Sequence, residues 1–282
     1  MIEHIEQRKD LWTGEVEILS NEPICDSMRK IAVRAPEFAS LVKPGQFLML
    51  RSLDGADPLL GRPFAAYDAD PETGRVEAIY AIVGKGTNRL ARARVGDKLA
   101  LWGPLGNGWE VAFRDKSPKR LALVAGGVGL APFYLLVKEL AKIPESERPE
   151  TTYLFGSRSA SRAICLDDFR ALGVDARVAT EDGSLGTKGF VTDALADLFP
   201  AGAEAFDALV LACGPSPMLR AVANFAFERG LECWTSLESP MACGMGMCFS
   251  CVVEWKTDDG TWDYKRTCVD GPVFDASRLK WN

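Results

Sequence analysis

Four cysteines near the C-terminus have the spacing of a metal-binding site. Cys243, Cys248 and Cys251 follow the pattern C-x4-C-x2-C, and sixteen residues separate the third from Cys268. Four thiolates at this spacing are typical of plant-type [2Fe–2S] clusters. The two glycines between the first and second cysteine suit a tight loop whose backbone N–H groups point at sulfur. The spacing therefore predicts a cluster that exchanges one electron at a time.

The same cysteines allow a second interpretation, a structural zinc ion in a binding module. Zinc sites usually pair two short C-x2-C knuckles, whereas Cys268 stands alone. A zinc module would also leave the phosphate-type loops described next without a role. Three other cysteines, Cys25, Cys165 and Cys233, have no ligand spacing and are interpreted as structural.

A second group of candidate residues lies in the middle of the chain. Gly126, Gly127 and Gly129 follow an apolar stretch, Leu121–Ala125, and precede a helical pattern at Phe133–Lys142. Glycines between a strand and a helix let the backbone approach a pyrophosphate at the helix N-terminus. The alternative is that these glycines serve strand–helix packing alone. We favour a dinucleotide site, because the turn follows the first strand of this region.

Two later strand ends are expected at the same edge. The pattern from residue 118 to 235 alternates strands and helices, which predicts a parallel sheet with its ligand crevice at the carboxyl ends of the strands. Cys213, Gly214 and Pro215 follow one such strand, and Ser157-Arg158 follows another. The serine and arginine suit an adenosine ribose or a 2′-phosphate, so both NAD and NADP remain open.

The first third of the chain predicts a closed antiparallel barrel. Short β-rich runs at 28–35, 46–52 and 75–83 are separated by turn signals. The loop Gly84-Lys85-Gly86-Thr87 leads into a helical stretch and suits a pyrophosphate. Arg62-Pro63 could direct a guanidinium at a phosphate or flavin edge. Three glycines in residues 103–108 predict a linker at the domain boundary.

Length and charge limit the remaining possibilities. The chain of 282 residues is long enough for two domains and an appendage, divided here as 1–110, 111–235 and 236–282. A net charge of −6 without a basic run argues against nucleic acid and anionic membranes. Residues 1–10, including His4, are polar and give no secretion signal, and a cluster of thiols indicates a reducing cytoplasm.

Together these stretches resemble the electron-transfer subunit of type B dihydroorotate dehydrogenase, in the ferredoxin-reductase superfamily. The two most specific stretches are Thr180–Gly189 and Glu238–Cys251, and the superfamily motifs at 62–64, 84–87, 103–108, 126–129 and 213–215 agree. The resemblance covers nearly the whole chain after residue 10 and implies three parts. These are a FAD-binding β-barrel, a parallel-sheet NAD-binding domain and a small [2Fe–2S] module.

The resemblance also implies which residues contact FAD. The corresponding positions in this sequence are Arg62, Pro63, Phe64, Ala65, Tyr80, Ala81, Ile82, Gly86 and Thr87. Two of them depart from the family pattern. Ala65 stands where serine is usual, which removes a hydroxyl from the flavin, and Ala81 stands where arginine is usual. Lys85 is expected to compensate for that lost charge.

The implied function is a relay in pyrimidine biosynthesis, in which electrons from dihydroorotate oxidation to orotate pass between a partner's FMN and NAD. An FMN-containing catalytic subunit is the expected partner, in a hetero-oligomer such as a heterotetramer. No residue here is expected to act as the base of that oxidation, and Glu238 is read equally as a surface carboxylate or a group near the flavin.

Small subunits of sulfhydrogenases and of bifurcating NADH-dependent ferredoxin:NADP oxidoreductases share the three-part plan. In the bifurcating branch one ligand is typically Asp, so four cysteines favour the dihydroorotate branch.

Overall fold

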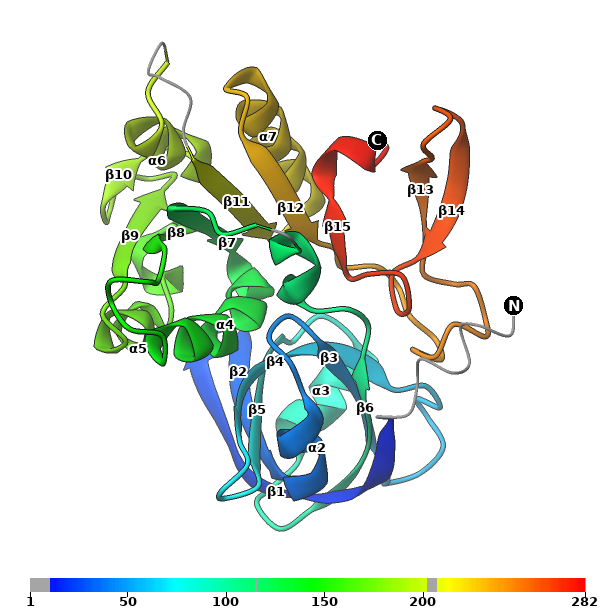
Figure 1. The fold of residues 1–282 in the computed structure, drawn as a ribbon. Helices are drawn as coiled ribbons and strands as arrows, with labels where there is room; N and C mark the ends of the chain where they lie inside the picture. Colours follow the sequence, from blue (N-terminus) through cyan, green and yellow to red (C-terminus); the bar gives the residue numbers. More distant parts are fainter. Residues whose placement is uncertain (1–10, 115, 202–206, 282) are drawn as a thin grey trace.

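The computed structural model describes residues 11–114, 116–201 and 207–281 (Figure 1). The predictions for Met1–Asp10 and His4 lie outside these residues. The chain forms a barrel, an α/β layer above it in Figure 1, and a small hairpin at the far end of the sheet. The predicted fold class, a β-barrel followed by a parallel-sheet domain and a C-terminal module, is confirmed.

The barrel closes through six antiparallel strands in the order β1-β2-β5-β4-β3-β6. Their bounds are β1 (Trp12–Cys25), β2 (Met28–Arg34), β3 (Phe47–Ser52), β4 (Arg62–Asp70), β5 (Arg75–Ala81) and β6 (Lys98–Leu105). The three runs predicted as strands are β2, β3 and β5. Alternate residues such as Leu48, Leu50, Leu99 and Leu101 fill the barrel, as the period of two requires.

Two helices accompany the barrel, α2 (Pro36–Leu41) and α3 (Lys85–Arg92). Helix α3 begins at Lys85, within the residues that the sequence predicts as a loop before the helix. Gly84 is extended, and the Thr87 hydroxyl accepts hydrogen bonds from the backbone N–H groups of Val83 and Gly84 at 3.0 and 3.2 Å. A side-chain cap on these donors stabilises the early start.

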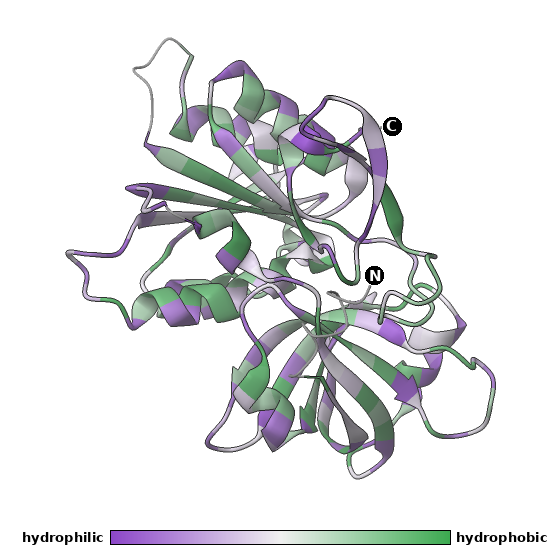
Figure 2. Ribbon diagram, turned by 45° about the vertical axis from the view of Figure 1, so that its right-hand side comes forward, coloured by the Kyte–Doolittle hydropathy of each residue, from purple (hydrophilic) through white to green (hydrophobic). Residues whose placement is uncertain are grey.

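The second layer is a seven-stranded sheet in the order β10-β9-β8-β7-β11-β12-β15. Six strands are parallel: β7 (Arg120–Gly126), β8 (Glu150–Ser157), β9 (Asp175–Thr180), β10 (Thr187–Lys188), β11 (Ala208–Cys213) and β12 (Glu232–Ser236). The central strands are coloured as hydrophobic in Figure 2. Such continuous apolar runs are expected where helices cover both faces of a sheet.

The two faces of the sheet bury different residues of the same strand. Leu121 and Leu123 of β7 pack toward the barrel, with α4 (Ala131–Ala141) and α5 (Leu166–Ala171). Ala122 and Val124 pack on the other face, with α6 (Val191–Leu198) and α7 (Ser216–Glu228). Short 3-10 turns η1 (Trp109–Phe113), η2 (Gly127–Leu130) and η3 (Ala160–Arg162) connect these elements.

The cysteine segment joins both larger units. It contains an antiparallel hairpin, β13 (Val252–Lys256) and β14 (Trp262–Arg266), and then β15 (Val273–Asp275) and η4 (Ala276–Arg278). Strand β15 pairs antiparallel with β12 and completes the sheet of the α/β layer. The predicted linker at 103–108 is instead the end of β6 and a turn. There the Asn107 N–H donates to the Gly271 carbonyl at 2.7 Å.

Candidate cofactor sites

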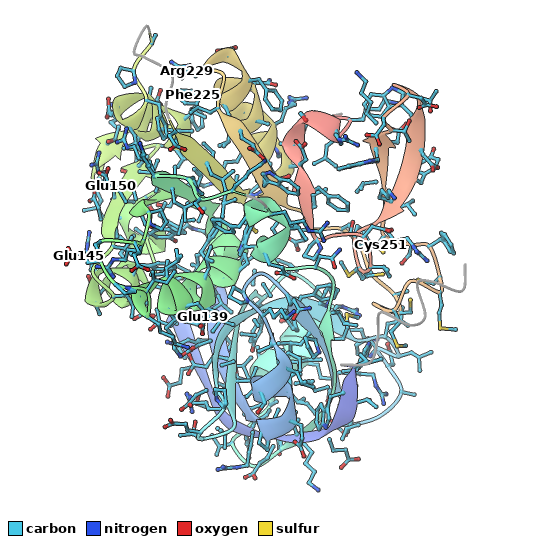
Figure 3. All side chains as sticks on the ribbon, in the orientation of Figure 1. Glu139, Glu145, Glu150, Phe225, Arg229 and Cys251 are labelled. Carbon is cyan, nitrogen blue, oxygen red and sulfur yellow. The ribbon has the colours of Figure 1, made fainter. Side chains whose placement is uncertain are left out.

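The four cysteines meet where the hairpin reaches the barrel, and Cys251 marks this place in Figure 3. Three backbone conformations with positive φ shape the loop, at Gly244 (71°), Gly246 (75°) and Phe249 (55°). Backbone N–H groups point at two sulfurs as predicted. Gly246 donates to Cys268 Sγ at 3.1 Å, and Met245 donates to Cys243 Sγ at 3.3 Å.

The thiols form two pairs. Hydrogen bonds from Ser250, and a further one with Cys243, lower the pKa of Cys248 to about 6. The Cys251 and Cys268 side chains hydrogen-bond to each other, which lowers the pKa of Cys251 to about 6 and raises that of Cys268. Hydrogen bonding to a thiolate favours the charged form, which is the form that binds metal.

The pairing of the thiols bears on the choice between two irons and one zinc ion. A tetrahedral zinc needs its four ligands around one point. A [2Fe–2S] cluster shares four cysteines between two irons, so two thiol pairs suit it.

The loop rests on an apolar patch outside the barrel. Phe47 and Met49 of β3, with Leu105 of β6, pack against the buried Cys251 and Cys268. Gly244 lies close above this patch, because a Cβ there would stand 2.9 Å from Met49 Cγ. Met245 is half-buried in the same cluster, whereas Met247 and Phe249 of the loop are exposed.

The barrel places the candidate flavin residues around the start of α3. Arg62 lies over Gly86, since a Cβ on Gly86 would be 2.9 Å from Arg62 Nε. The Arg62 guanidinium also donates to the carbonyls of Leu60 and Gly61 at 3.0 Å. A guanidinium above the first turn of a helix provides charge and N–H donors together. These residues therefore fit a pyrophosphate such as that of FAD.

Other candidate flavin residues are less accessible. Tyr80 is buried in the barrel, and its hydroxyl donates a hydrogen bond to Asn21 Oδ1 at 2.9 Å. Its side chain is therefore not available to a ligand. Burial raises the pKa of Tyr80 to about 12. Phe64 packs beside it, with ring centroids 5.6 Å apart. Pro63, Ala65, Ala81 and Ile82 are half-buried and keep some surface for a ligand.

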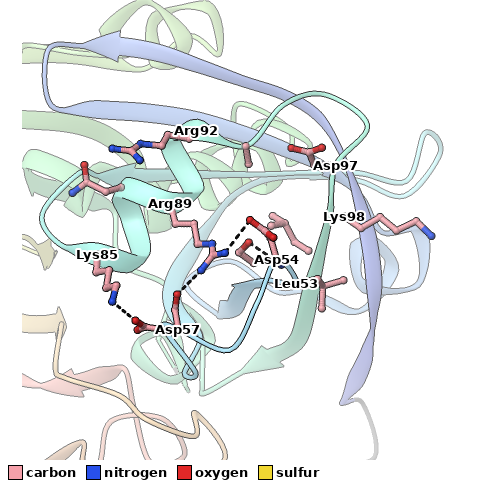
Figure 4. Close-up of a pocket in the computed structure, with 12 residues that line it drawn as sticks. Leu53, Asp54, Asp57, Lys85, Arg89, Arg92, Asp97 and Lys98 are labelled. Carbon is pink, nitrogen blue, oxygen red and sulfur yellow. Dashed lines mark hydrogen bonds and ion pairs between the residues drawn. The ribbon is translucent and has the colours of Figure 1, made fainter.

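Lys85 does not have the free charge that the sequence suggested. It forms an ion pair with Asp57 in the loop before β4, and Arg89 pairs with Asp54 of the same loop at 2.9 Å (Figure 4). These residues line an open cleft of about 730 Å³ between this loop, α3 and the start of β6. Sequence motifs gave no signal for this cleft, because its loop and helix pair only in three dimensions.

The nucleotide turns meet at the carboxyl edge of the sheet. A Cβ on Gly129 would stand 2.2 Å from the Cys213 carbonyl oxygen, so the turns after β7 and β11 are in direct contact. Gly126 and Gly214 each face Met218 of α7, at 2.6 Å for an added Cβ. Only at Gly129 is the close contact with backbone, so glycine is needed for packing there, whereas the Met218 side chain is flexible. Gly127 is different, because it has φ of 58° and no atom closer than 3.9 Å to an added Cβ.

Cys213 lies inside this edge. Burial raises the pKa of its thiol to about 12, opposed by a hydrogen bond with Ser236, and the Glu238 charge raises it further. Pro215 immediately precedes α7. The sequence did not single out Ser236 or Met218. Ser236 contacts Cys213, and Met218 contacts Gly126, only because the fold brings separate segments together. Ser157 donates to the Ser159 carbonyl at 2.9 Å, and Arg158 beside it is exposed.

Two family models match the chain, one in its middle and one near its C-terminus. Residues 238–280 match the iron–sulfur cluster binding domain of dihydroorotate dehydrogenase B, and residues 123–224 match an oxidoreductase NAD-binding domain. The match at 238–280 contains all four cysteines. In the described residues, no helix is long and apolar enough to cross a bilayer.

Curated relatives match over nearly their whole length. The chain is 38% identical to the dihydroorotate dehydrogenase B (NAD(+)) electron transfer subunit of Fusobacterium nucleatum, over 92% of this chain and 95% of that protein. It is 37% identical to the Bacillus velezensis protein of the same name, over 93% and 96%.

Solved structures agree on the fold. An NADH-dependent reduced ferredoxin-NADP oxidoreductase, studied for flavin-based electron bifurcation, is similar with a TM-score of 0.78 and 30% identity, over 94% of this chain and 90% of that one. A ferredoxin NADP+ reductase from Neisseria gonorrhoeae has a TM-score of 0.65 at 18% identity, over 77% and 92%, a similarity of fold alone.

Proposed function

The chain belongs to the family of dihydroorotate dehydrogenase B electron transfer subunits, and we propose that it relays electrons between NAD and a catalytic partner subunit that oxidises dihydroorotate to orotate. The relay belongs to pyrimidine biosynthesis. The observation that carries this proposal is the four-cysteine segment, whose Cys251 and Cys268 pack on strands β3 and β6 of the barrel. The thiol cluster also indicates a reducing compartment, so the proposal includes a cytoplasmic location.

Three groups of residues would hold the cofactors. The proposed cluster ligands are Cys243, Cys248, Cys251 and Cys268. The proposed FAD residues are Arg62, Pro63, Phe64, Ala65, Tyr80, Ala81, Ile82, Gly86 and Thr87. The proposed NAD residues are Gly126, Gly127, Gly129, Cys213, Gly214 and Pro215. A flavin exchanges both hydride and single electrons, which joins two-electron nicotinamide chemistry to one-electron cluster chemistry.

The contribution of this chain is placement. Arg62 and the first turn of α3 hold a pyrophosphate at the barrel, while the β7 turn presents its backbone to a second dinucleotide. The half-buried Cys213 borders that turn, and its raised pKa keeps the thiol protonated. We assign no acid or base of dihydroorotate oxidation to these residues, so that proton transfer belongs to the partner.

The proposed partner is an FMN-containing catalytic subunit that docks beside the cysteines. Met247 is 77% exposed and Phe249 is 61% exposed on the loop. The same surface continues onto the hairpin through exposed Val252, Trp262 and Tyr264. A two-stranded hairpin is marginal alone in water, so a partner covering it would also stabilise it. Such docking makes a hetero-oligomer, and we propose a heterotetramer.

Reconstitution tests the proposal. The chain, loaded with FAD and cluster, is mixed with an FMN-containing dihydroorotate-oxidising subunit, and NADH formation from dihydroorotate and NAD⁺ is followed by absorbance. We expect NADH only when both proteins are present. Phe249→Glu should weaken the complex about tenfold or more, as for a central aromatic contact. Phe227→Glu is the matched control, because Phe227 is an exposed phenylalanine on α7, outside the cysteine loop and the hairpin. Absence of NADH with the wild-type pair would refute the assignment.

A ferredoxin-linked role is the second candidate. The similarity to the bifurcating oxidoreductase, at 30% identity and a TM-score of 0.78, favours it. The four cysteines, in place of the usual aspartate ligand of that branch, favour the dihydroorotate role. Ferredoxin reduction by NADH and NADPH, without any response to dihydroorotate, would select the second candidate.

A further inference from the structure

Trp102 joins the candidate flavin loop to the first cysteine. It lies on β6, between Thr13 of β1 and Met49 of β3. Its neighbours Leu101 and Leu99 point into the barrel, so the alternation of a strand directs Trp102 outward, toward the cysteine loop. The indole N–H donates to the Cys243 carbonyl at 3.0 Å.

The other edge of the indole touches the flavin loop. Gly61 immediately precedes Arg62, and a Cβ on Gly61 would stand 2.4 Å from Trp102 Cη2. Only glycine permits so close an approach. One side chain thus contacts the backbone before Arg62 and the backbone of Cys243.

The cysteine module has two arms, one that carries Cys243, Cys248 and Cys251 and one that carries Cys268, and they are held differently. The Cys268 arm is fixed by the side-chain amide of Asn107, which donates to the Val269 and Asp270 carbonyls at 3.3 and 3.1 Å. It is also fixed by the pairing of β15 with β12. In the part of the chain that the structure describes, the Trp102 bond is the hydrogen bond that ties the Cys243 arm to the barrel. Trp102 therefore adds a directional contact at Cys243 to the apolar packing of Gly244 on Met49.

We propose that Trp102 is a positioning residue that fixes the distance and orientation between the flavin site at Arg62 and the cluster site at Cys243. The inference rests on the proposed function, because it concerns electron exchange between those two sites. The indole is rigid and has two contacts. One edge packs on Gly61, before Arg62, and its N–H donates a hydrogen bond to the carbonyl of Cys243, a proposed ligand residue.

Trp102→Phe tests this role in the full chain loaded with FAD and cluster. NADH is mixed anaerobically in a stopped-flow instrument, and the flavin and cluster bands are followed separately. Loss of one hydrogen bond should slow cluster reduction about fivefold, while flavin reduction keeps its wild-type rate. The electron paramagnetic resonance spectrum of the reduced cluster should also change.

The matched control is Trp281→Phe. The Trp281 indole donates to the Ala276 carbonyl at 3.1 Å and is partly buried, and it packs in the hydrophobic cluster under α6 and α7, which contains none of the four proposed ligand cysteines. It should leave both rates and the spectrum unchanged. If Trp102→Phe also leaves the cluster rate and spectrum unchanged, the proposal is wrong.

Gly61→Ala provides a test that keeps the indole. The added methyl displaces the ring from the flavin side, and cluster reduction should slow again with full cluster content. Unchanged cluster reduction in Gly61→Ala would overturn the proposal even if Trp102→Phe failed to load a cluster. A wild-type chain that binds neither FAD nor cluster would instead refute the proposed function.

Discussion

The nucleotide edge and the cysteine module are built in opposite ways. At the nucleotide edge, β7 and β11 are buried between two layers of helices, and the turns after them pack directly on each other through Gly129 and Cys213. The cysteine module has one two-stranded hairpin and an exposed loop. Its order comes from the barrel, through the apolar patch, Trp102 and Asn107.

The difference has a functional meaning. A dinucleotide is recognised mainly by backbone, so its site can be self-contained within the sheet. A cluster that exchanges electrons with a partner must lie near the surface, where little core is available. Support from the flavin barrel supplies order and fixes the distance to the flavin at the same time. Variants in the two regions should therefore fail in different ways.

Cys248→Ser should have the largest effect. Cys248 is exposed, so its replacement removes a proposed ligand without disturbing a core. We expect complete loss of the cluster by iron analysis and visible absorption, and loss of NADH formation with the partner. NADH-dependent reduction of an artificial dye should persist. If dye reduction disappeared too, the cysteine module and the nucleotide region would not be separable.

Gly129→Ala should damage the other region. The new Cβ would stand 2.2 Å from the Cys213 carbonyl, a backbone atom that cannot move aside cheaply. We expect a loss of about 3 kcal/mol in the free energy of unfolding, at the upper end of overpacking effects, together with weak nicotinamide binding. Urea denaturation measures this. Gly127→Ala is the control, since that Cβ meets open space and only its φ of 58° adds strain. Equal stability of wild type and Gly129→Ala would remove the packing role.

Alkaline pH should weaken the barrel and the α/β layer together. Burial raises the pKa of Tyr80 to about 12, and the pKa values of Tyr67, Tyr134 and Tyr153 are also raised. A tyrosine of the unfolded chain ionises near pH 10, so its contribution is complete below about pH 10 and is lost as pH rises toward 12. For Tyr80 this loss is about 2–3 kcal/mol.

Urea unfolding at a series of pH values measures this effect. The slope of stability against pH should be smaller for Tyr80→Phe. Because the cysteine module depends on the barrel, the cluster band should disappear in the same transition as the far-ultraviolet dichroism. Cluster loss at a clearly lower pH would show that the module is not supported in this way.

Tyr67→Phe should have the smallest effect. The Tyr67 hydroxyl donates to Asp168 Oδ2 at 2.5 Å, linking β4 of the barrel to α5 of the α/β layer. Lys30 lies 3.8 Å from the same carboxylate and remains as its partner. We expect a loss of about 1.5 kcal/mol in unfolding free energy and little change in cluster content. A large loss of cluster would mean that the contact between the barrel and the α/β layer, and not Trp102, holds the cysteine module in position.

Local motifs were predictable from the sequence, and long-range support was not. The spacing of the cysteines, the glycine turn at 126–129 and the barrel strands depend on neighbours in sequence, so their patterns are visible there. The bond from Trp102 to Cys243 joins residues 141 apart, and nothing local specifies it. The same holds for β15, which leaves the cysteine segment to complete the sheet.

Individual side-chain roles were also hidden. Lys85 has the right charge for a phosphate, yet Asp57 lies close enough to pair with it. The alternation of the strand directs Tyr80 into the barrel, where Asn21 Oδ1 accepts a hydrogen bond from its hydroxyl. The structure assigns one of the candidate nucleotide glycines, Gly129, a packing role that the sequence had left open beside phosphate binding.

The central claim is that electrons pass between nicotinamide and the cysteine module by way of the flavin barrel. Anaerobic mixing of NADH with two forms of the chain, both with full cluster content and one depleted of FAD, tests it directly. We predict that the cluster band bleaches in the FAD-loaded form, after the flavin band, and stays unchanged without FAD. Equal bleaching in both forms, or none in the loaded form, would contradict the account.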